Sequence, residues 1–445
     1  MNKRNKILLK SIRVIDPTNE LDQISDITIH GKKIDYLEKA NFSKPNVSDD
    51  YIIYNCNDLI LCPGIVDARV HLNGPTEENI LKLQNVAAKS GVLKLITLPN
   101  QNPIVDDATV VEYLYEKSNK KYMPEIFTFG SATKKFNGIE ISELGLMSEA
   151  GVKGFSDGVH CIQDSLVMRR VMSYASMLKK PVIQHAEDRS LAGLDEVTTT
   201  TIRGEMNESE ISTRLGLVGI PSCAEVIIIE RDLRIAKLTN AHYHVSNVTT
   251  KDSIEAIKRG KEEGVNITCD TSPSYFSLNE LELSSYNTSF KLSPPLRSEE
   301  DRLSIIQGIK DGIIDIISSD HFPQSKDTKI LPFSSASTGA AGLETLLPLT
   351  LGLVNQGHVN ILQAIKMLTI NPAKIFQITL PKISKGSLAS FIILDLEKPH
   401  IIDKEHLLSN PTPFHKRPVE GMNLASFING KIIYMNDDFK ELKNA

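Results

Sequence analysis

The stretch VDARVHLNGP holds two side chains whose spacing is typical of a metal site. Residues two apart on a strand point to the same face, so a His-x-His pair at a strand end can bind one ion. In this chain the second position is His71, but the first is Arg69. The stretch therefore indicates a metal hydrolase, a hydrolase with an altered site, or a protein that kept a fold and lost its chemistry.

Polar side chains also end several other apolar runs of the sequence. Those at the predicted strand ends are Asp67, Arg69, His71, Asn100, Asp157, His185, Glu187, Asp188, His244, Asn247, Tyr275, Asp320 and His321. Each has a structural explanation as well, because a lone histidine on a strand is more often a hydrogen-bonded core residue and an aspartate before a helix is usually an N-cap. Their common position at strand ends favours one shared site.

The elements that would hold these residues alternate between apolar strands and helical segments. The first strand-like run, LILCPGIVDARVH, is followed by seven more, each with its own connection. Repeated β–α alternation means a parallel sheet, and eight units predict an α/β fold of the (β/α)8 TIM-like barrel type, with its chemistry where strands end. A doubly wound open sheet is the alternative, but no G-x-G-x-x-G follows a strand to support a dinucleotide site.

Both ends of the chain are rich in short strand patterns. The last part contains two strand-like runs and an Asn-Gly turn at Asn429-Gly430, a strong hairpin signal. We predict a small composite β-domain built from residues 1–60 and 385–445, with the barrel over residues 61–384.

The composition sets further limits on function. The 445 residues carry a net charge of -5, which gives no electrostatic footprint for nucleic acid. The five cysteines include no C-x-x-C pair, so a reducing compartment is favoured over a disulfide framework. The apolar stretch at the N-terminus is too short and too charged for a signal peptide, and no run approaches the roughly 18 apolar residues of a membrane span. We expect a cytoplasmic protein that binds neither membranes nor nucleic acid.

Several strings resemble the dihydroorotase family of the amidohydrolase superfamily, over roughly residues 5 to 435. They are PGIVDARVHL, ITLPNQNPIVDD, FSDG, QHAEDRSLAG, KLSPPLRSEEDR, IDIISSDHFP, GLETLLPLTL, TINPAKI and FINGKIIY. The resemblance implies a zinc-dependent barrel with a composite β-domain, often a homo-oligomer. It also implies the interconversion of carbamoyl-aspartate and dihydroorotate in pyrimidine synthesis.

The metal-ligand positions that the resemblance implies are only half retained. Three of the six carry the family's residue type, namely His71, His185 and Asp320. The other three are replaced, by Arg69, Gly158 and Asn247. Three lost ligands would lower zinc affinity at least about 1,000-fold, since even an outer partner is worth roughly 10- to 100-fold.

The substrate positions that the resemblance implies are altered too. Asn73 replaces the arginine that grips the substrate carboxylate, whereas Asn100 is kept as a substrate contact. Tyr275 stands at the end of a Pro-x-His pattern, and Gln324 at the end of an Ala-Pro-His pattern.

Two hypotheses follow for the chemistry of the barrel mouth. In the first, Arg69 stands in for the metal by pairing with Asp320 and with Asp157, because a guanidinium cannot become a ligand and repels a dication. In the second, His71, His185 and Asp320 hold a single zinc ion, completed by His244 or Asp157, and Asp320 is the general base. His244 lies three residues before Asn247 and should face the other side of its strand.

The functional hypotheses divide in the same way. The first is a dihydroorotase-like protein with weak or no activity of its own, which serves as a partner of aspartate transcarbamoylase, as the resemblance implies for some members. The second is an active, zinc-dependent dihydroorotase with a mononuclear site and a small-molecule substrate. A third, an allantoinase or hydantoinase, agrees less well with PPLRSEEDR beside GLETLLPLTL.

Overall fold

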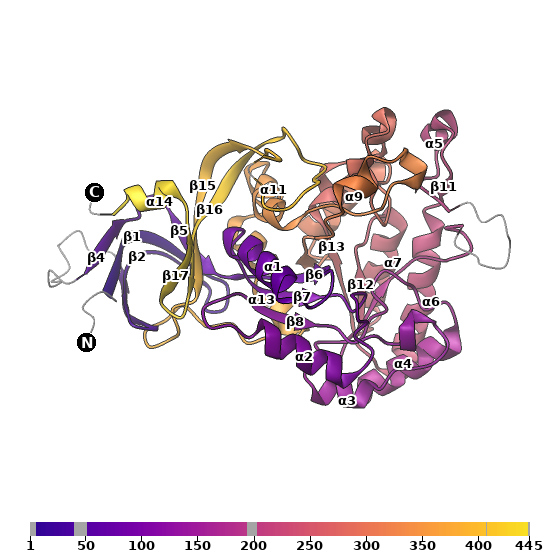
Figure 1. The fold of residues 1–445 in the computed structure, drawn as a ribbon, viewed down its shortest axis with the longest axis horizontal. Coiled ribbons are helices and arrows are strands. Elements are labelled where there is room, and N and C mark those ends of the chain that lie inside the picture. The colour runs from indigo at the N-terminus through magenta and orange to yellow at the C-terminus, as the bar shows by residue number, and fades with distance from the viewer. Residues whose placement is uncertain (1–5, 40–50, 194–202, 406, 444–445) are drawn as a thin grey trace.

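A computed structural model describes residues 6–39, 51–193, 203–405 and 407–443. Figure 1 shows two parts, a strand-rich end and a larger part in which strands are surrounded by helices. No described helix is long and apolar enough to cross a membrane.

The larger part is a parallel barrel. Its strands are β6 (Ile65–Val70), β7 (Val92–Thr97), β8 (Glu125–Thr128), β9 (Val182–His185), β12 (Tyr243–Ser246), β13 (Ile267–Thr271) and β14 (Ile316–Ile317). The fourth position of the wall is a single residue, Phe155, which bridges Gly130 on one side and Val182 on the other. A parallel bridge between Val70 and His321 closes the ring.

Helices cover the outside of this ring, and β12 and its neighbours are almost wholly buried. The α-helices of this part are α1 (Glu77–Lys89), α2 (Ala108–Ser118), α3 (Leu144–Glu149), α4 (Ser165–Met177), α5 (Glu210–Leu215), α6 (Cys223–Thr239), α7 (Lys251–Glu262), α8 (Pro273–Ser277), α9 (Glu299–Lys310), α10 (Lys326–Lys329), α11 (Leu343–Asn355), α12 (Ile361–Leu368) and α13 (Ile370–Ile375). The short elements are β10 (Met206–Asn207), β11 (Gly219–Ile220), η1 (Lys134–Phe136), η2 (Glu280–Ser285), η3 (Thr288–Phe290) and η4 (Phe333–Ser335).

The strand-rich end is an eight-stranded sheet with the order β17-β16-β15-β5-β1-β2-β3, to which β4 adds by pairing with β1. Its strands are β1 (Lys6–Asp16), β2 (Leu21–His30), β3 (Lys33–Lys39), β4 (Ile52–Asn55), β5 (Ile60–Pro63), β15 (Phe391–Ile401), β16 (Pro418–Ile428) and β17 (Lys431–Met435), and α14 (Asp437–Glu441) packs beside them. The antiparallel pairing of β15 with β5 joins the two ends of the chain. The indigo and yellow strands in Figure 1 therefore belong to one sheet.

The core of this sheet is aromatic and aliphatic. The rings of Phe391 and Phe427 stack at 4.7 Å, and those of Tyr54 and Phe439 at 4.6 Å. The predicted fold class, a barrel with a small β-domain from both termini, is confirmed. The limits at residues 60/61 and 384/385 stay a prediction, and β5 crosses the first of them.

Candidate functional site at the barrel mouth

Arg69 is the centre of the candidate site. It lies near the end of β6, on the same strand face as Asp67, and only 1% of its surface is exposed. Its Nε donates to Asp320 Oδ1 at 2.7 Å, and its Nη1 donates to Ser246 Oγ at 2.9 Å. Burial alone would lower the pKa of Arg69, but the charges of Asp320 and Asp270 hold it above its ordinary value. The guanidinium thus ties β6 to β12 and to the segment after β14.

Asp320 and Asn247 share an unusual backbone conformation. Their φ angles are 49° and 58°, in the left-handed region that few residues other than glycine adopt. Such conformations cost energy and concentrate at functional sites. Here they turn the chain sharply where two barrel strands end.

Asp270 continues the network behind Arg69. Its Oδ2 accepts from Ser246 Oγ at 3.1 Å and lies 3.0 Å from His244 Nε2, while its Oδ1 accepts from the Asn247 amide at 2.9 Å. Burial would raise the pKa of Asp270, but the contact with His244 and the charge of Arg69 lower it. Asp270 therefore remains a carboxylate in the core of the barrel.

His244 faces this interior network. Its Nδ1 lies 2.8 Å from Thr268 Oγ1, which also lies 2.8 Å from His242 Nε2. A chain of polar contacts consequently runs from His242 through His244 and Asp270 to Arg69. Both ring nitrogens of His244 are engaged in it, so His244 has no free nitrogen for a metal ion.

Asp157 is held by neighbours other than Arg69. Its Oδ1 accepts from Ser131 Oγ at 3.1 Å and from the Thr133 amide at 2.8 Å, and its Oδ2 accepts from the Thr133 hydroxyl. These bonds join the loop after β8 to the fourth position of the wall. The predicted ion pair between Asp157 and Arg69 is not formed, because three nearby donors already satisfy the Asp157 carboxylate.

Gly158 offers no room for a ligand. Its φ is 67°, and a Cβ atom there would lie 2.8 Å from Asn100 Oδ1. A bridging aspartate at residue 158 would be strained and would collide with Asn100.

His71 and His185 lie close to Arg69 but differ in their contacts. His71 Nδ1 lies 3.3 Å from Asn100 Nδ2, and the His71 ring stacks on Phe322 at 3.7 Å. His185 is buried, and neither of its ring nitrogens has a hydrogen-bond partner among the described residues. Burial and then the charge of Arg69 lower the pKa of His185 to about 3, and the same two causes place that of His71 well below its usual value. Both imidazoles are neutral.

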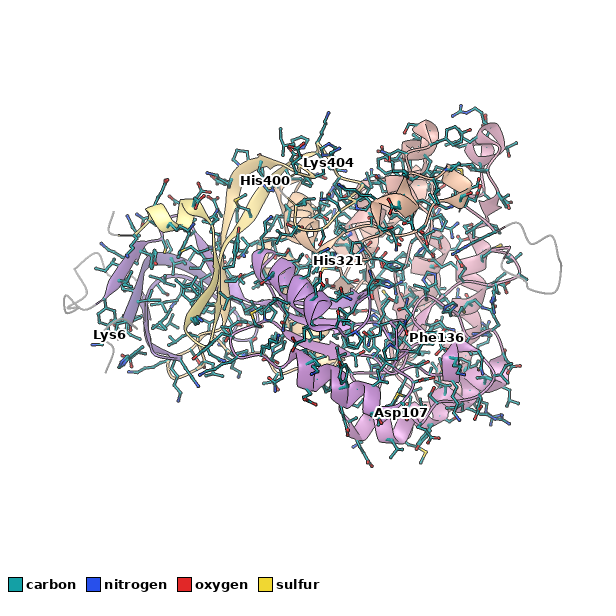
Figure 2. All side chains as sticks on the ribbon, in the orientation of Figure 1. Lys6, Asp107, Phe136, His321, His400 and Lys404 are labelled. Atoms are coloured by element: carbon teal, nitrogen blue, oxygen red, sulfur yellow. The ribbon has the colours of Figure 1, made fainter. Side chains whose placement is uncertain are left out.

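The remaining candidates have structural contacts or lie outside the network. His321 Nδ1 accepts from the Gly342 and Leu343 amides at the start of α11, and His321 lies inside the barrel part of the molecule (Figure 2). Tyr275 donates its hydroxyl to the Pro294 carbonyl at 2.8 Å. Asn73 is exposed in the loop before α1.

Ser246 and Asp270 are site residues that the sequence reasoning missed. Asp270 is the penultimate residue of β13, between Cys269 and Thr271. A charged residue within a buried strand was the available signal, since such a residue needs a partner in the core.

Asp67 gives a test of the electrostatics of the site. Its Oδ2 has no partner among the described residues, and burial raises its pKa to about 6. Between about pH 4 and pH 6, the folded state therefore keeps a proton on Asp67 that the unfolded state, with a pKa near 3.9, has released. The cost of ionising Asp67 in the folded state thus appears as the pH rises through this range. We expect Asp67→Asn to add about 1–3 kcal/mol to the free energy of unfolding at pH 7.5 and little at pH 4.

Urea unfolding at both pH values measures this difference. Asp58→Asn, which removes the same charge from an exposed position, is the matched control. Equal effects of the two variants at pH 7.5 would contradict the assignment of a buried carboxylate cost to Asp67.

The sequence of this chain is similar to the sequences of known proteins of one family. The family profile described as "Dihydro-orotase-like" matches residues 58–253. A dihydroorotase of Ehrlichia canis (strain Jake) is 37% identical over 430 residues, which span 95% of this chain and 93% of the relative. The chain belongs to the dihydroorotase family. Another dihydroorotase, from Wolbachia sp. subsp. Drosophila simulans (strain wRi), is 34% identical over 435 residues and 96% of each chain.

Solved structures agree with the fold of this dihydroorotase-family chain. The L-hydantoinase (dihydropyrimidinase) from Arthrobacter aurescens superposes with a TM-score of 0.81 at 21% identity and covers 96% of both chains. The dihydropyrimidinase from Brevibacillus agri NCHU1002 gives 0.77 at 18% identity, over 97% of this chain and 95% of the other. At these identities the likeness concerns the fold alone.

The zinc ion that the dihydroorotase resemblance implies does not fit the residues at the barrel mouth. Within residues 6–39, 51–193, 203–405 and 407–443, no three His, Cys, Asp or Glu side chains are grouped so that they could hold a metal ion. The Arg69 guanidinium occupies one oxygen of Asp320, and it can neither lose its proton to become a ligand nor lie beside a dication without repulsion.

Proposed function

We propose that this chain is a dihydroorotase-like protein of pyrimidine synthesis with little or no activity of its own, and that it acts as a partner of aspartate transcarbamoylase. The observation that carries the first half is the ion pair between Arg69 Nε and Asp320 Oδ1 at 2.7 Å. The family's relatives at about 35% identity support the dihydroorotase-like part. The partner role rests on the resemblance to family members of this kind.

The proposed loss of activity has a physical reason. Hydrolysis of a cyclic amide requires a strong nucleophile at neutral pH and a polarised carbonyl. A metal ion supplies the first by lowering the pKa of bound water to about 7 and the second by acting as a Lewis acid. Arg69 supplies positive charge but no site for water to ionise. Asp320, the proposed general base, uses one oxygen to bind Arg69 instead of a reacting water.

The alternative is an active zinc-dependent dihydroorotase with a mononuclear site at His71, His185 and Asp320. The name dihydroorotase, carried by curated relatives over nearly the whole chain, favours it. This alternative requires Arg69 to leave Asp320, and it leaves zinc without the help of His244 or Asp157, both of which are hydrogen-bonded elsewhere.

Elemental analysis of the purified full-length chain tests the proposal directly. After dialysis against zinc and removal of excess metal, we expect far less than one zinc ion per chain. We also expect the thermal midpoint to be the same with and without added zinc, because a ligand stabilises only the state that binds it. One tightly held zinc ion per chain would overturn the proposal in favour of the alternative.

The partner role needs a separate measurement. We expect this chain to co-elute with aspartate transcarbamoylase of the same organism in size-exclusion chromatography and to raise its thermal midpoint. Separate elution at micromolar concentrations would remove the partner role while leaving the statement about zinc untouched.

A further inference from the structure

A groove lies where the barrel part meets the strand-rich part, away from the barrel mouth. Its volume is about 930 Å³, and it is lined by α8, the start of α9, α11, the end of β15 and the start of β16. Figure 1 shows β15 and β16 extending from the strand-rich end toward α11, which β16 contacts. Clefts of roughly 300–1,000 Å³ between two parts of a protein are common sites for small ligands. No residue of the Arg69 network lines this groove.

Arg417 is a half-buried cation in the wall of the groove. Its guanidinium lies 5.7 Å from the centre of the Phe414 ring, and its Nη1 donates to the Ser277 carbonyl at 3.2 Å. Among the described residues this is the one hydrogen bond of the Arg417 side chain, and no carboxylate there forms an ion pair with it. Most of its N–H donors therefore remain for a ligand.

The charged groups around Arg417 leave it without a direct counter-charge. Burial and the charge of Arg302 lower the pKa of Arg417, and the more distant charge of Glu282 raises it. The carboxylate of Glu299 is already taken, because Arg302 donates to both of its oxygens, at 2.7 and 2.6 Å. An acidic group placed beside Arg417 would thus gain charge-assisted hydrogen bonds in a partly desolvated position.

The strand side of the groove is mainly apolar. Ile401 lines it and is 63% exposed, and Pro418 and Val419 lie beside it on β16. The next residue, Glu420, accepts from Asn355 Nδ2 at 2.9 Å. Apolar surface next to a single cation suits a ligand that is apolar over most of its length and acidic at one end.

The helix side of the groove includes bare backbone. Pro348 and Gly352 are four residues apart on α11 and both line the groove, so they lie on one face of the helix. A glycine inside a helix is less stable than an alanine, and a Cβ atom at Gly352 would have nothing within 4 Å. Packing within the chain therefore does not require a glycine here, and the open space is available to a ligand.

We propose that this groove binds a small molecule with an apolar body and one acidic group. The body lies against Ile401 and the bare helix surface at Gly352, and the acidic group binds Arg417. The proposal goes beyond the proposed function, because it involves neither the barrel mouth nor zinc.

Two fluorescent probes that differ by one acidic group test the proposal on the full-length chain. They are 8-anilinonaphthalene-1-sulfonate (ANS) and N-phenyl-1-naphthylamine (NPN), which has the same rings without the sulfonate. We expect saturable binding of one ANS molecule per chain with a Kd of about 100 μM or below. Raising the ionic strength from about 0.02 M to about 0.5 M should weaken the binding of ANS and leave that of NPN unchanged. The absence of saturable ANS binding would overturn the proposal.

An arginine variant tests the recognition of the acidic group. Arg417→Gln should weaken ANS binding about 10-fold or more and leave NPN binding within about twofold, because only ANS bonds to the guanidinium. Lys416→Gln, which removes an exposed charge from the neighbouring position, should leave both affinities within about twofold. An unchanged ANS affinity in Arg417→Gln would overturn the proposal. If Arg417→Gln fails to fold, the ionic-strength series decides, and equal salt dependence of the two probes would overturn it.

A glycine variant locates the apolar body. Gly352→Met places a flexible side chain in the groove and should weaken both probes about 10-fold or more, while methionine favours the helix more than glycine does. Gly352→Ala adds only the Cβ atom and should leave both affinities within about twofold. Unchanged binding of both probes to Gly352→Met would overturn the site. Since none of these residues contacts the Arg69 network, the zinc measurement is independent of the result.

Discussion

Replacing Arg69 by methionine should lower the free energy of unfolding by about 3–5 kcal/mol. The guanidinium is buried beside two carboxylates, those of Asp320 and Asp270. Removal of one partner from a buried ion pair leaves a charge that neither water nor protein compensates, and this is more costly than the pair itself is stabilising. Urea unfolding followed by circular dichroism measures the loss, since the chain has no tryptophan for fluorescence.

Two controls separate this effect from the loss of any arginine. Arg13 forms an exposed pair with Asp22, and Arg13→Met should cost no more than about 1 kcal/mol. The double variant Arg69→Met, Asp320→Asn should recover part of the stability, because asparagine tolerates the left-handed backbone of residue 320 and removes the charge that Arg69→Met leaves unpaired. If Arg69→Met lowered the free energy of unfolding by as little as Arg13→Met does, the buried ion pair would contribute no more to stability than the exposed one.

Carbamoyl-aspartate cyclisation by the purified chain should be slower than about 0.001 s⁻¹, at least roughly 1,000-fold below the lower end of ordinary turnover near 1 s⁻¹. Under the proposed function, in which Arg69 stands in for the metal ion, no group in the Arg69 network replaces a metal-bound water or polarises the carbonyl of the substrate as a metal ion would. Added zinc should leave the rate unchanged. The assay follows dihydroorotate formation with and without zinc.

Asp320→Asn identifies the origin of any trace of product. If Asp320 acts as a general base, this variant lowers the rate, whereas contaminating enzyme or uncatalysed reaction leaves it unchanged; we expect no change. A rate near 1 s⁻¹ that rises with zinc and falls in Asp320→Asn would establish the active enzyme instead.

The fold could be predicted largely from the alternation of apolar and helical segments. That pattern fixes the direction of the strands, and parallel strands end at the same rim, so Arg69 and Asp320 could be expected near each other. Alternation also predicts His244 on the face opposite to Asn247, and this stays a prediction. The reduction of the fourth strand to Phe155 was not predictable, because a single bridge depends on how Gly130 and Val182 approach it.

The contacts of individual polar groups were harder to foresee. Asp157 has Ser131 and Thr133 as neighbours through the loop after β8, whose path the sequence pattern does not specify. Asp270 escaped notice because a single polar residue was considered for the end of its strand, although its carboxylate contacts His244, Ser246, the Asn247 amide and Ser318. Side-chain partners follow from three-dimensional proximity, whereas periodicity gives only the face on which a residue lies.

The connection that Arg69 makes between β6, β12 and the segment after β14 is part of the polypeptide. A bound ion stabilises a fold by an amount that rises with the logarithm of its free concentration above the Kd, and this stabilisation is lost on chelation or dilution. A side chain is present once in every molecule from the moment of synthesis. The connection that Arg69 makes between these three segments therefore requires neither a supply of metal in the cell nor a particular order of folding and metal loading.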